Sequence, residues 1–303
     1  MTNTHLALLV ATAFATTAQA YDFESLAVPD TFEAATEVRA TPGYRNKLGK
    51  RHTLQYHTLM RSGERRSDQL FGLLHNSEGN LLHDTTGGAR ISNKNDFSSL
   101  LKLDRGLFML THFEEIPGAI YISELSQASD SGLLNVERTR PLDLSGIGGG
   151  WNFCAGSTTP WQTHLGSEEY EPNAAARDPE TGAIDRYFQA MAAYFDGDPA
   201  SLNPYDYGWQ LEIRVGDFQR VQPHKRYAMG RLSHEAGLVM PDRRTVYISD
   251  DAHNTALFRF LADRPGDLSS GTLYAARWRQ TSADRGGSAS LEWIDLGLSL
   301  IHI

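Results

Sequence analysis

Short segments with period-two alternation limit the fold of this chain more than any other feature of its sequence. Residues 209–215 (WQLEIRV) alternate apolar and polar side chains, and residues 245–249 (TVYIS) are β-branched and aromatic. Residues 271–278 (GTLYAARW) alternate less strictly. Alternation over segments of this length is typical of half-buried β-strands, so the sequence predicts a sheet protein.

Strand-like segments also lie earlier in the chain. Residues 107–110 and 119–122 are apolar and flank the turn residues Pro117 and Gly118, whereas residues 59–96, rich in Gly, Ser, Asn and Asp, are expected to be mostly loop. Strands at this spacing favour a sandwich, a barrel or a propeller over βαβ units. No repeat of fixed period is visible, so the pattern alone does not select a propeller. We therefore predict an all-β fold.

One helical insertion is expected within this pattern. The side chains that recur at helical spacing end just before Gly197 and Pro199; they are Ile184, Tyr187, Phe188, Met191, Tyr194 and Phe195. Such a stripe usually packs on a core, so we predict a short helix that covers the sheet rather than a lipid or cofactor site.

Composition narrows the possible partners. The chain has 303 residues, of which 40% are hydrophobic, and 28 Lys and Arg against 37 Asp and Glu give a net charge of −9. This acidic balance, without a long basic run, argues against nucleic-acid binding. An acidic protein that acts on an anion such as phosphate needs local positive charge, which bound metal ions supply compactly.

Both ends of the chain carry segments that we expect not to belong to the folded domain. Residues 1–20, uncharged and ending in Ala18-Gln19-Ala20, are typical of a Sec-type signal peptide, with a buried N-terminal helix as the alternative. No later segment reaches the about 20 apolar residues of a membrane span. We therefore expect a secreted or periplasmic monomer without a membrane span, whose folded domain covers residues 21–297.

The last six residues suggest a different origin. Residues 298–303 (LSLIHI) back-translate to CTGTCTCTTATACACATC, which resembles the transposon-end adapter of sequencing libraries. We expect an adapter-derived tail on a chain whose C-terminal part is missing. A genuine terminal strand of alternating apolar residues is the alternative.

The only cysteine lies in the segment with the most chemical character. Cys154 follows the glycine run Gly148-Gly149-Gly150 and precedes the adjacent carboxylates Glu168 and Glu169. A soft thiolate beside hard carboxylates suits iron or zinc next to calcium. Neighbouring strand residues point to opposite sides, so only one of the two glutamates can share the thiol's pocket unless a bulge reorients the other. An inert buried cysteine is the alternative.

Three further groups of polar residues could belong to the same site. His234-Glu235 begins like the zinc motif HExxH, but Leu238 occupies the place of the second histidine, which excludes that motif. Asp250-Asp251 follows a strand, where two adjacent carboxylates repel each other unless a cation neutralises them. Glu114 lies at the end of the strand 107–110. Solvated turns or surface loops are the alternatives for all three.

Several motifs together resemble the PhoX-type alkaline phosphatase family. They occur in one order over about residues 151–277, at residues 151–169, 207–213, 225–235, 246–251 and 271–277. The resemblance implies a β-propeller, incomplete here and expected to be part of a six-bladed one, that hydrolyses phosphate monoesters. It also implies iron (Fe3+) and calcium, with Cys154 bridging two irons and carboxylate ligands at Glu114, one of Glu168 and Glu169, Glu235, and one of Asp250 and Asp251.

Departures from the family pattern limit what the resemblance carries. Ser167 stands where the family usually has a cysteine, and the signal is of the Sec type rather than twin-arginine.

We expect Arg231 and His234 to add hydrogen bonds to phosphate during metal-assisted phosphoryl transfer. The alternatives are a noncatalytic calcium-binding propeller and a propeller hydrolase acting on phosphodiesters or lactones.

Overall fold

The computed structural model describes residues 21–32, 39–54, 56–175, 182, 186–283 and 287–298. The predicted signal peptide and residues 299–303 of the predicted tail lie outside the described residues. The chain divides into two compact units, residues 1–58 and 59–303. The first contains one small antiparallel sheet in the order β1 (Asp22–Phe23), β2 (Gly43–Arg45), β3 (Arg51–Thr53).

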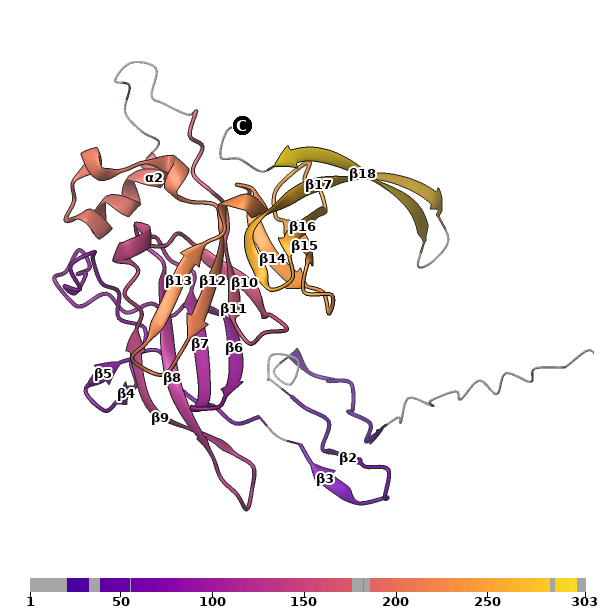
Figure 1. The fold of residues 1–303 in the computed structure, drawn as a ribbon. Helices are drawn as coiled ribbons and strands as arrows, with labels where there is room; N and C mark the ends of the chain where they lie inside the picture. The colour runs from indigo at the N-terminus through magenta and orange to yellow at the C-terminus, as the bar shows by residue number, and fades with distance from the viewer. Residues whose placement is uncertain are drawn as a thin grey trace, which may run out of the picture. The chain divides into compact units, whose positions relative to one another are not determined.

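The second unit contains a two-stranded sheet and three larger antiparallel sheets, which we call blades 1 to 3. In each blade every strand pairs with the next one along the chain (Figure 1). Blade 1 contains β6 (Asn95–Leu103), β7 (Gly106–Phe113), β8 (Ala119–Gln127) and β9 (Leu134–Pro141). Blade 2 contains β10 (Phe153–Thr158), β11 (His164–Glu168), β12 (Gln210–Val215) and β13 (Val221–Lys225). Blade 3 contains β14 (His234–Val239), β15 (Thr245–Asp250), β16 (Phe258–Arg264), β17 (Asp267–Ser282) and β18 (Ser288–Leu298).

The first strands of the three sheets lie next to one another, because β10 contacts β6 on one side and β14 on the other. Radially repeated up-and-down sheets with their first strands innermost form a β-propeller. The predicted all-β fold is therefore confirmed, and the chain forms an incomplete propeller. The predicted loop-rich region holds β4 (Arg65–Arg66) and β5 (Gln69–Leu70), with isolated bridges beyond them.

The helical insertion lies between β11 and β12 and differs in detail from the expectation. One turn of α-helix, α2 (Arg186–Gln189), continues as a 3-10 helix, η2 (Ala190–Phe195). Phe188, Met191 and Tyr194 are buried against a cluster with Trp151 and Tyr207, which confirms their predicted packing role. Their spacing of three residues matches the period of a 3-10 helix, in which side chains i and i+3 eclipse. Ile184 lies outside the described residues.

Two short 3-10 turns, η3 (Pro199–Ser201) and η4 (Pro204–Asp206), lead from this insertion to β12. Each begins at a residue whose side chain accepts a hydrogen bond from the backbone: Asp198 from Ala200 N, and Asn203 from Tyr205 N. Proline at the first position has no N–H to leave unsatisfied, so each turn starts without a lost hydrogen bond.

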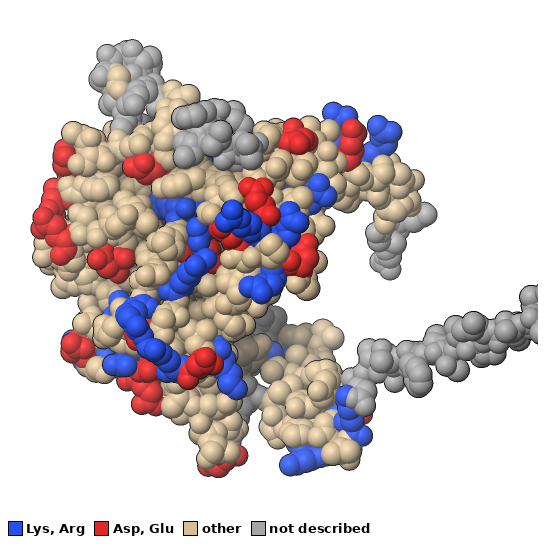
Figure 2. All heavy atoms as spheres, in the orientation of Figure 1, with Lys and Arg blue, Asp and Glu red and all other residues tan. Residues whose placement is uncertain are grey.

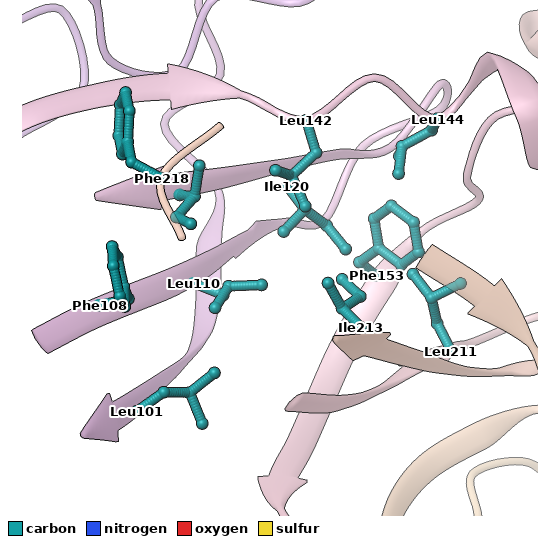
Figure 3. Packing of buried hydrophobic residues seen from close by; sticks show 11 residues of the cluster. Leu101, Phe108, Leu110, Ile120, Leu142, Leu144, Phe153, Leu211, Ile213 and Phe218 are labelled. Carbon is teal, nitrogen blue, oxygen red and sulfur yellow. The ribbon is translucent and has the colours of Figure 1, made fainter. Parts of the chain in front are cut away.

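The apolar core lies between the sheets and fixes the start of β10 (Figure 3). Phe153 is fully buried among Leu110 and Ile120 of blade 1 and Leu211 and Ile213 of blade 2. Truncating a fully buried phenylalanine to alanine costs about 3–5 kcal/mol, so Phe153 holds the strand that carries Cys154 firmly in place.

The described residues form no helix long and apolar enough to cross a membrane. On the face shown in Figure 2, Lys and Arg side chains are interspersed with Asp and Glu. Ion pairs between partly exposed side chains include Arg138 with Glu124 and Arg220 with Asp217.

Candidate metal centre

The first strand of every blade contains a β-bulge near its beginning. The register between the first two strands of each blade jumps from Asn95–Phe113 to Ser98–Thr111, from Phe153–Glu168 to Gly156–Gly166, and from His234–Asp250 to Gly237–Ile248. At each jump, two residues on the first strand oppose one residue on the second. A bulge of this kind re-aims the side chain of the extra residue, and bulges are common next to active sites.

The first residues of the three bulges are Asp96, Cys154 and Glu235, one from each blade. They converge on one point: Sγ of Cys154 lies 3.1 Å from Oε2 of Glu235 and 4.0 Å from Oδ2 of Asp96. Each of these residues has a side chain that can bind a metal ion.

Each blade also presents a carboxylate at a second matching position. Glu114, Glu169 and Asp251 each directly follow the residue of the second strand that pairs before the bulge. Their backbone N–H groups donate to equivalent carbonyl oxygens, at 2.9 Å to Lys94, 3.1 Å to Asn152 and 3.0 Å to Ser233. The three blades therefore repeat one local structure that offers two ligand side chains.

Three of these side chains form a compact ligand cluster. One ligand atom each from Cys154, Glu169 and Glu235 lies within 4.8 Å of the others. Asn152, whose φ of 39° is unusual for a residue other than glycine, directs Nδ2 toward Oε1 of Glu114 at 3.3 Å and Oε2 of Glu169 at 3.5 Å. Glu114 is thereby linked to the cluster through Asn152.

The electrostatics of the cluster favour a bound cation. Burial, the hydrogen bond with Asp251 and the charge of Glu235 raise the pKa of Glu169 to about 7. Burial and the neighbouring carboxylates Glu235, Glu169 and Asp96 also raise the pKa of the Cys154 thiol far above its usual value. Groups that repel one another in this way are stabilised when a cation lies between them.

Asp251 and Asp250 have different surroundings. The hydroxyl of Tyr170 donates to Oδ2 of Asp251 at 2.8 Å, and this bond together with Glu169 lowers the pKa of Asp251. Asp250 is half-buried and pairs with His234 across β14 and β15, and burial raises its pKa. Of the two, Asp251 is the one connected to the cluster.

Glu168 points away from the thiol, as strand geometry predicted for one member of its pair. It is fully buried, and its Oε1 lies 3.0 Å from Nζ of Lys225. Backbone N–H groups of Trp151, Gly208 and Trp209 also donate to this carboxylate, at distances between 3.0 and 3.1 Å. Glu168 therefore ties the glycine-rich segment before Cys154 to the beginning of β12.

Arg231 and His234 make their described hydrogen bonds within the protein. The guanidinium of Arg231 donates to the carbonyl oxygens of Tyr207 at 2.8 Å and Pro204 at 3.0 Å. His234 is fully buried, with Nε2 bonded to the carbonyl oxygen of Gly230 at 2.9 Å and Nδ1 to Nε2 of Gln210 at 3.1 Å. Burial lowers the pKa of His234 to about 4. These contacts fix the segment that leads into Glu235.

Three residues at the site were not among the candidates from the sequence. They are Asp96, Asn152 and Tyr170. Asn152 lies within the motif at residues 151–169 and Tyr170 directly follows it, so their position was a usable signal. Asp96 had none, because only the bulge in β6 aims it toward Cys154.

Comparisons with known proteins agree with this architecture. The family described as alkaline phosphatase PhoX matches residues 125–299. A solved structure of Pseudomonas fluorescens PhoX, in complex with vanadate as a transition state analogue, is similar with a TM-score of 0.53 and 17% sequence identity. The match covers 79% of this chain and 55% of that one, so the chain spans about half the length of that protein. No protein among the curated sequences matches.

Proposed function

The chain belongs to the PhoX family of alkaline phosphatases, and on that premise we propose that it hydrolyses phosphate monoesters at a metal centre on the first strands of its blades. The observation that carries this proposal is the convergence of Cys154, Glu169 and Glu235 within 4.8 Å. A buried carboxylate, Glu169, and a half-buried one, Glu235, beside the only thiol of the chain form an unfavourable cluster unless a cation binds there.

The donor set fits a mixed centre. A thiolate is a soft ligand that suits iron or zinc, whereas carboxylate oxygens suit calcium. We propose iron, as Fe3+, bound by Cys154, Glu169 and Glu235, and calcium bound by the more peripheral carboxylates Glu114 and Asp251. Asp96, whose Oδ2 lies 4.0 Å from the thiol, is a further candidate ligand.

We assign the remaining candidates to supporting roles. Glu168 is engaged by Lys225 and three backbone N–H groups, so Glu169 is the proposed ligand of that pair. Arg231 and His234 are engaged by backbone carbonyl oxygens, which supports a role in holding the segment before Glu235 rather than direct contact with phosphate. Asp250, which pairs with His234, has the same supporting place.

The chemistry of the centre follows from charge. Bound cations would neutralise the phosphate oxygens and supply an activated oxygen nucleophile. Neighbouring residues orient the carboxylates. Asn152 places an amide donor between Glu114 and Glu169, and the hydroxyl of Tyr170 donates to Asp251. Phe153 and Trp151, both fully buried, keep water away from the backbone behind the thiol.

We also propose that the protein is exported through residues 1–20, which are uncharged and end in Ala18-Gln19-Ala20 as signal peptides do. Fusion of residues 1–20 to a reporter that is active only outside the cytoplasm tests this directly. Export is expected from the intact segment. Retention of the reporter in the cytoplasm would contradict the proposal.

The decisive experiment is elemental analysis and phosphatase assay on one purified sample, before and after Cys154→Ala. We expect nearly stoichiometric iron and calcium, hydrolysis of a phosphomonoester, and loss of both iron and hydrolysis in the variant. Ser123→Ala, which removes a buried hydrogen bond to Thr139 within blade 1, is the matched control and should leave both unchanged.

Other outcomes separate the alternatives. Calcium alone with no turnover would indicate a noncatalytic propeller whose blades are held by calcium. Turnover of a phosphodiester or a lactone in preference to the phosphomonoester would indicate a different hydrolase. Full iron occupancy in the Cys154→Ala variant would remove the thiol from the centre.

A further inference from the structure

A buried pair of histidines lies between blades 1 and 2, behind the ligand cluster. His112 of β7 and His164 of β11 are fully buried, and their Nε2 atoms are 2.7 Å apart. Nδ1 of His164 lies 2.8 Å from Oγ of Ser99, and Nδ1 of His112 lies 2.5 Å from the backbone carbonyl oxygen of Cys154. These groups form a continuous chain of hydrogen bonds that ends at the residue carrying the thiol.

The carbonyl group of Cys154 determines which atom donates in each of these hydrogen bonds. A carbonyl oxygen only accepts, so Nδ1 of His112 carries a proton. A neutral imidazole has one N–H, so Nε2 of His112 accepts from Nε2 of His164, and Nδ1 of His164 accepts from the hydroxyl of Ser99. Burial favours the neutral form of both rings: it lowers the pKa of His112 to about 4 and holds the pKa of His164 well below its usual value.

Packing leaves the two rings little freedom. A Cβ atom at Gly166 would lie 2.6 Å from the ring of His112 and 2.9 Å from Nε2 of His164, so only glycine fits there. The rings of Phe97 and Phe153 lie 5.8 Å and 5.4 Å from that of His112. The donor on Nδ1 is therefore held against the carbonyl oxygen of Cys154.

The next junction between blades uses the same arrangement. Ser167 opposes the bulge of blade 2 at the position that His112 occupies in blade 1. Its Oγ lies 2.7 Å from the backbone carbonyl oxygen of Glu235, the bulge residue of blade 3. The single hydroxyl proton is shared with the carbonyl oxygen of Ala155 in its own blade, so Ser167 joins the two bulges. At both junctions, the residue opposite one blade's bulge binds the carbonyl oxygen of the next blade's ligand residue.

We propose that His112 and Ser167 are positioning residues that fix the backbone of Cys154 and Glu235 and so place the thiol and carboxylate for metal binding. A bulge interrupts the pairing within its own sheet, so its orientation depends on contacts from outside that sheet. His164 and Ser99 keep His112 in the donating tautomer. The proposal rests on the proposed function only in taking the cluster as a metal site.

The test compares two side chains of similar size at position 112, one with a hydrogen-bond donor and one without. His112→Asn keeps an amide donor near the place of Nδ1, whereas His112→Leu has nearly the same shape without a donor. Cadmium is titrated into the full metal-free chain and followed by calorimetry and by the ultraviolet absorption of the cadmium–thiolate bond, which reports on Cys154 without any assay of turnover. We expect His112→Leu to weaken cadmium binding by about 10–100-fold, the usual cost of losing a group that orients a ligand.

His112→Asn should recover most of this affinity, and Ser167→Ala should weaken binding through Glu235. Ser123→Ala is again the matched control, because it removes a buried hydroxyl hydrogen bond remote from the cluster and should lower thermal stability alone. Equal cadmium affinities in folded His112→Leu and His112→Asn would overturn the proposal. If neither variant folds, unchanged affinity in Ser167→Ala would overturn it.

The same samples separate this proposal from the proposed function. Suppose that cadmium binds more tightly when residue 112 carries a donor, but the protein loaded with iron and calcium hydrolyses no phosphomonoester. This result supports the positioning role and refutes the phosphatase. If the loaded wild-type protein hydrolyses the phosphomonoester, and cadmium affinity is the same with and without a donor at position 112, the phosphatase is supported and the positioning role is refuted.

Discussion

Replacing Lys225 by methionine tests whether Glu168 is a structural carboxylate. The side chains of this ion pair are 1% and 0% exposed, and Nζ of Lys225 also donates to the carbonyl oxygen of Asp206 at 2.7 Å. Removing one partner of a buried pair leaves an uncompensated charge and costs about 3–5 kcal/mol. Three backbone N–H groups still donate to Glu168 in the variant, so we expect a loss of about 3 kcal/mol, near the lower limit.

The pH dependence of this loss provides an internal check. Burial already raises the pKa of Glu168 above 4.5, and Lys225 opposes that shift, so the variant should have a still higher pKa. A carboxyl group whose folded pKa exceeds its unfolded value stabilises the protein at low pH, and this contribution is lost as the pH rises through the folded pKa. Lys225→Met should therefore be more destabilising at pH 8 than at pH 5.

Urea denaturation at the two pH values measures the free energy of unfolding. Arg277→Met is the matched control, because it breaks a surface pair with Glu292 whose side chains are 60% and 59% exposed and should cost about 0–1 kcal/mol. A loss below about 1 kcal/mol for Lys225→Met at pH 8, or a loss independent of pH, would refute the reasoning. Cadmium affinity should remain near that of the wild type, since Glu168 lies outside the proposed ligands.

Two further predictions concern the ligand cluster and the helical insertion. In the metal-free protein, stability should fall as the pH rises from 4.5 toward 7, because the pKa of Glu169 is raised to about 7 in the folded state. Glu169→Gln should flatten the profile of melting temperature against pH. An unchanged profile would contradict the raised pKa of Glu169. Phe188→Ala should cost about 3–5 kcal/mol in the free energy of unfolding, because Phe188 is 1% exposed in the cluster with Trp151; a loss comparable to that of an exposed residue would mean that the insertion does not pack there.

The strands could be predicted from the sequence because their side-chain alternation reflects burial on one face. Residues 209–215 and 245–249 correspond to β12 and β15 almost to the residue. The helix was harder, because a stripe at spacings of three and four is compatible with either helix type. The arrangement at Phe188, Met191 and Tyr194 is decided by packing against Trp151 and Tyr207.

The ligand cluster was predictable as a set of residue types but not as a geometry. Cys154, Glu169 and Glu235 stood out because a thiol and carboxylates occupied turn-like segments, yet the choice between Glu168 and Glu169 depends on register. The repeat among the blades was invisible, because Asp96 and Cys154 are 58 residues apart, whereas Cys154 and Glu235 are 81 apart. The helical insertion within blade 2 accounts for the unequal spacing.

The bulges have a consequence for the order in which the protein matures. Cys154 and Glu169 come from blade 2 and Glu235 from blade 3, and the backbones of the bulges at Cys154 and Glu235 are each bonded to the preceding blade. A separately folded sheet would therefore present only part of the proposed ligand set, so binding of the proposed ion would have to follow the docking of blades 2 and 3. Because an ion that binds only the docked state also stabilises it, metal supply would act on assembly of the propeller as well as on its chemistry.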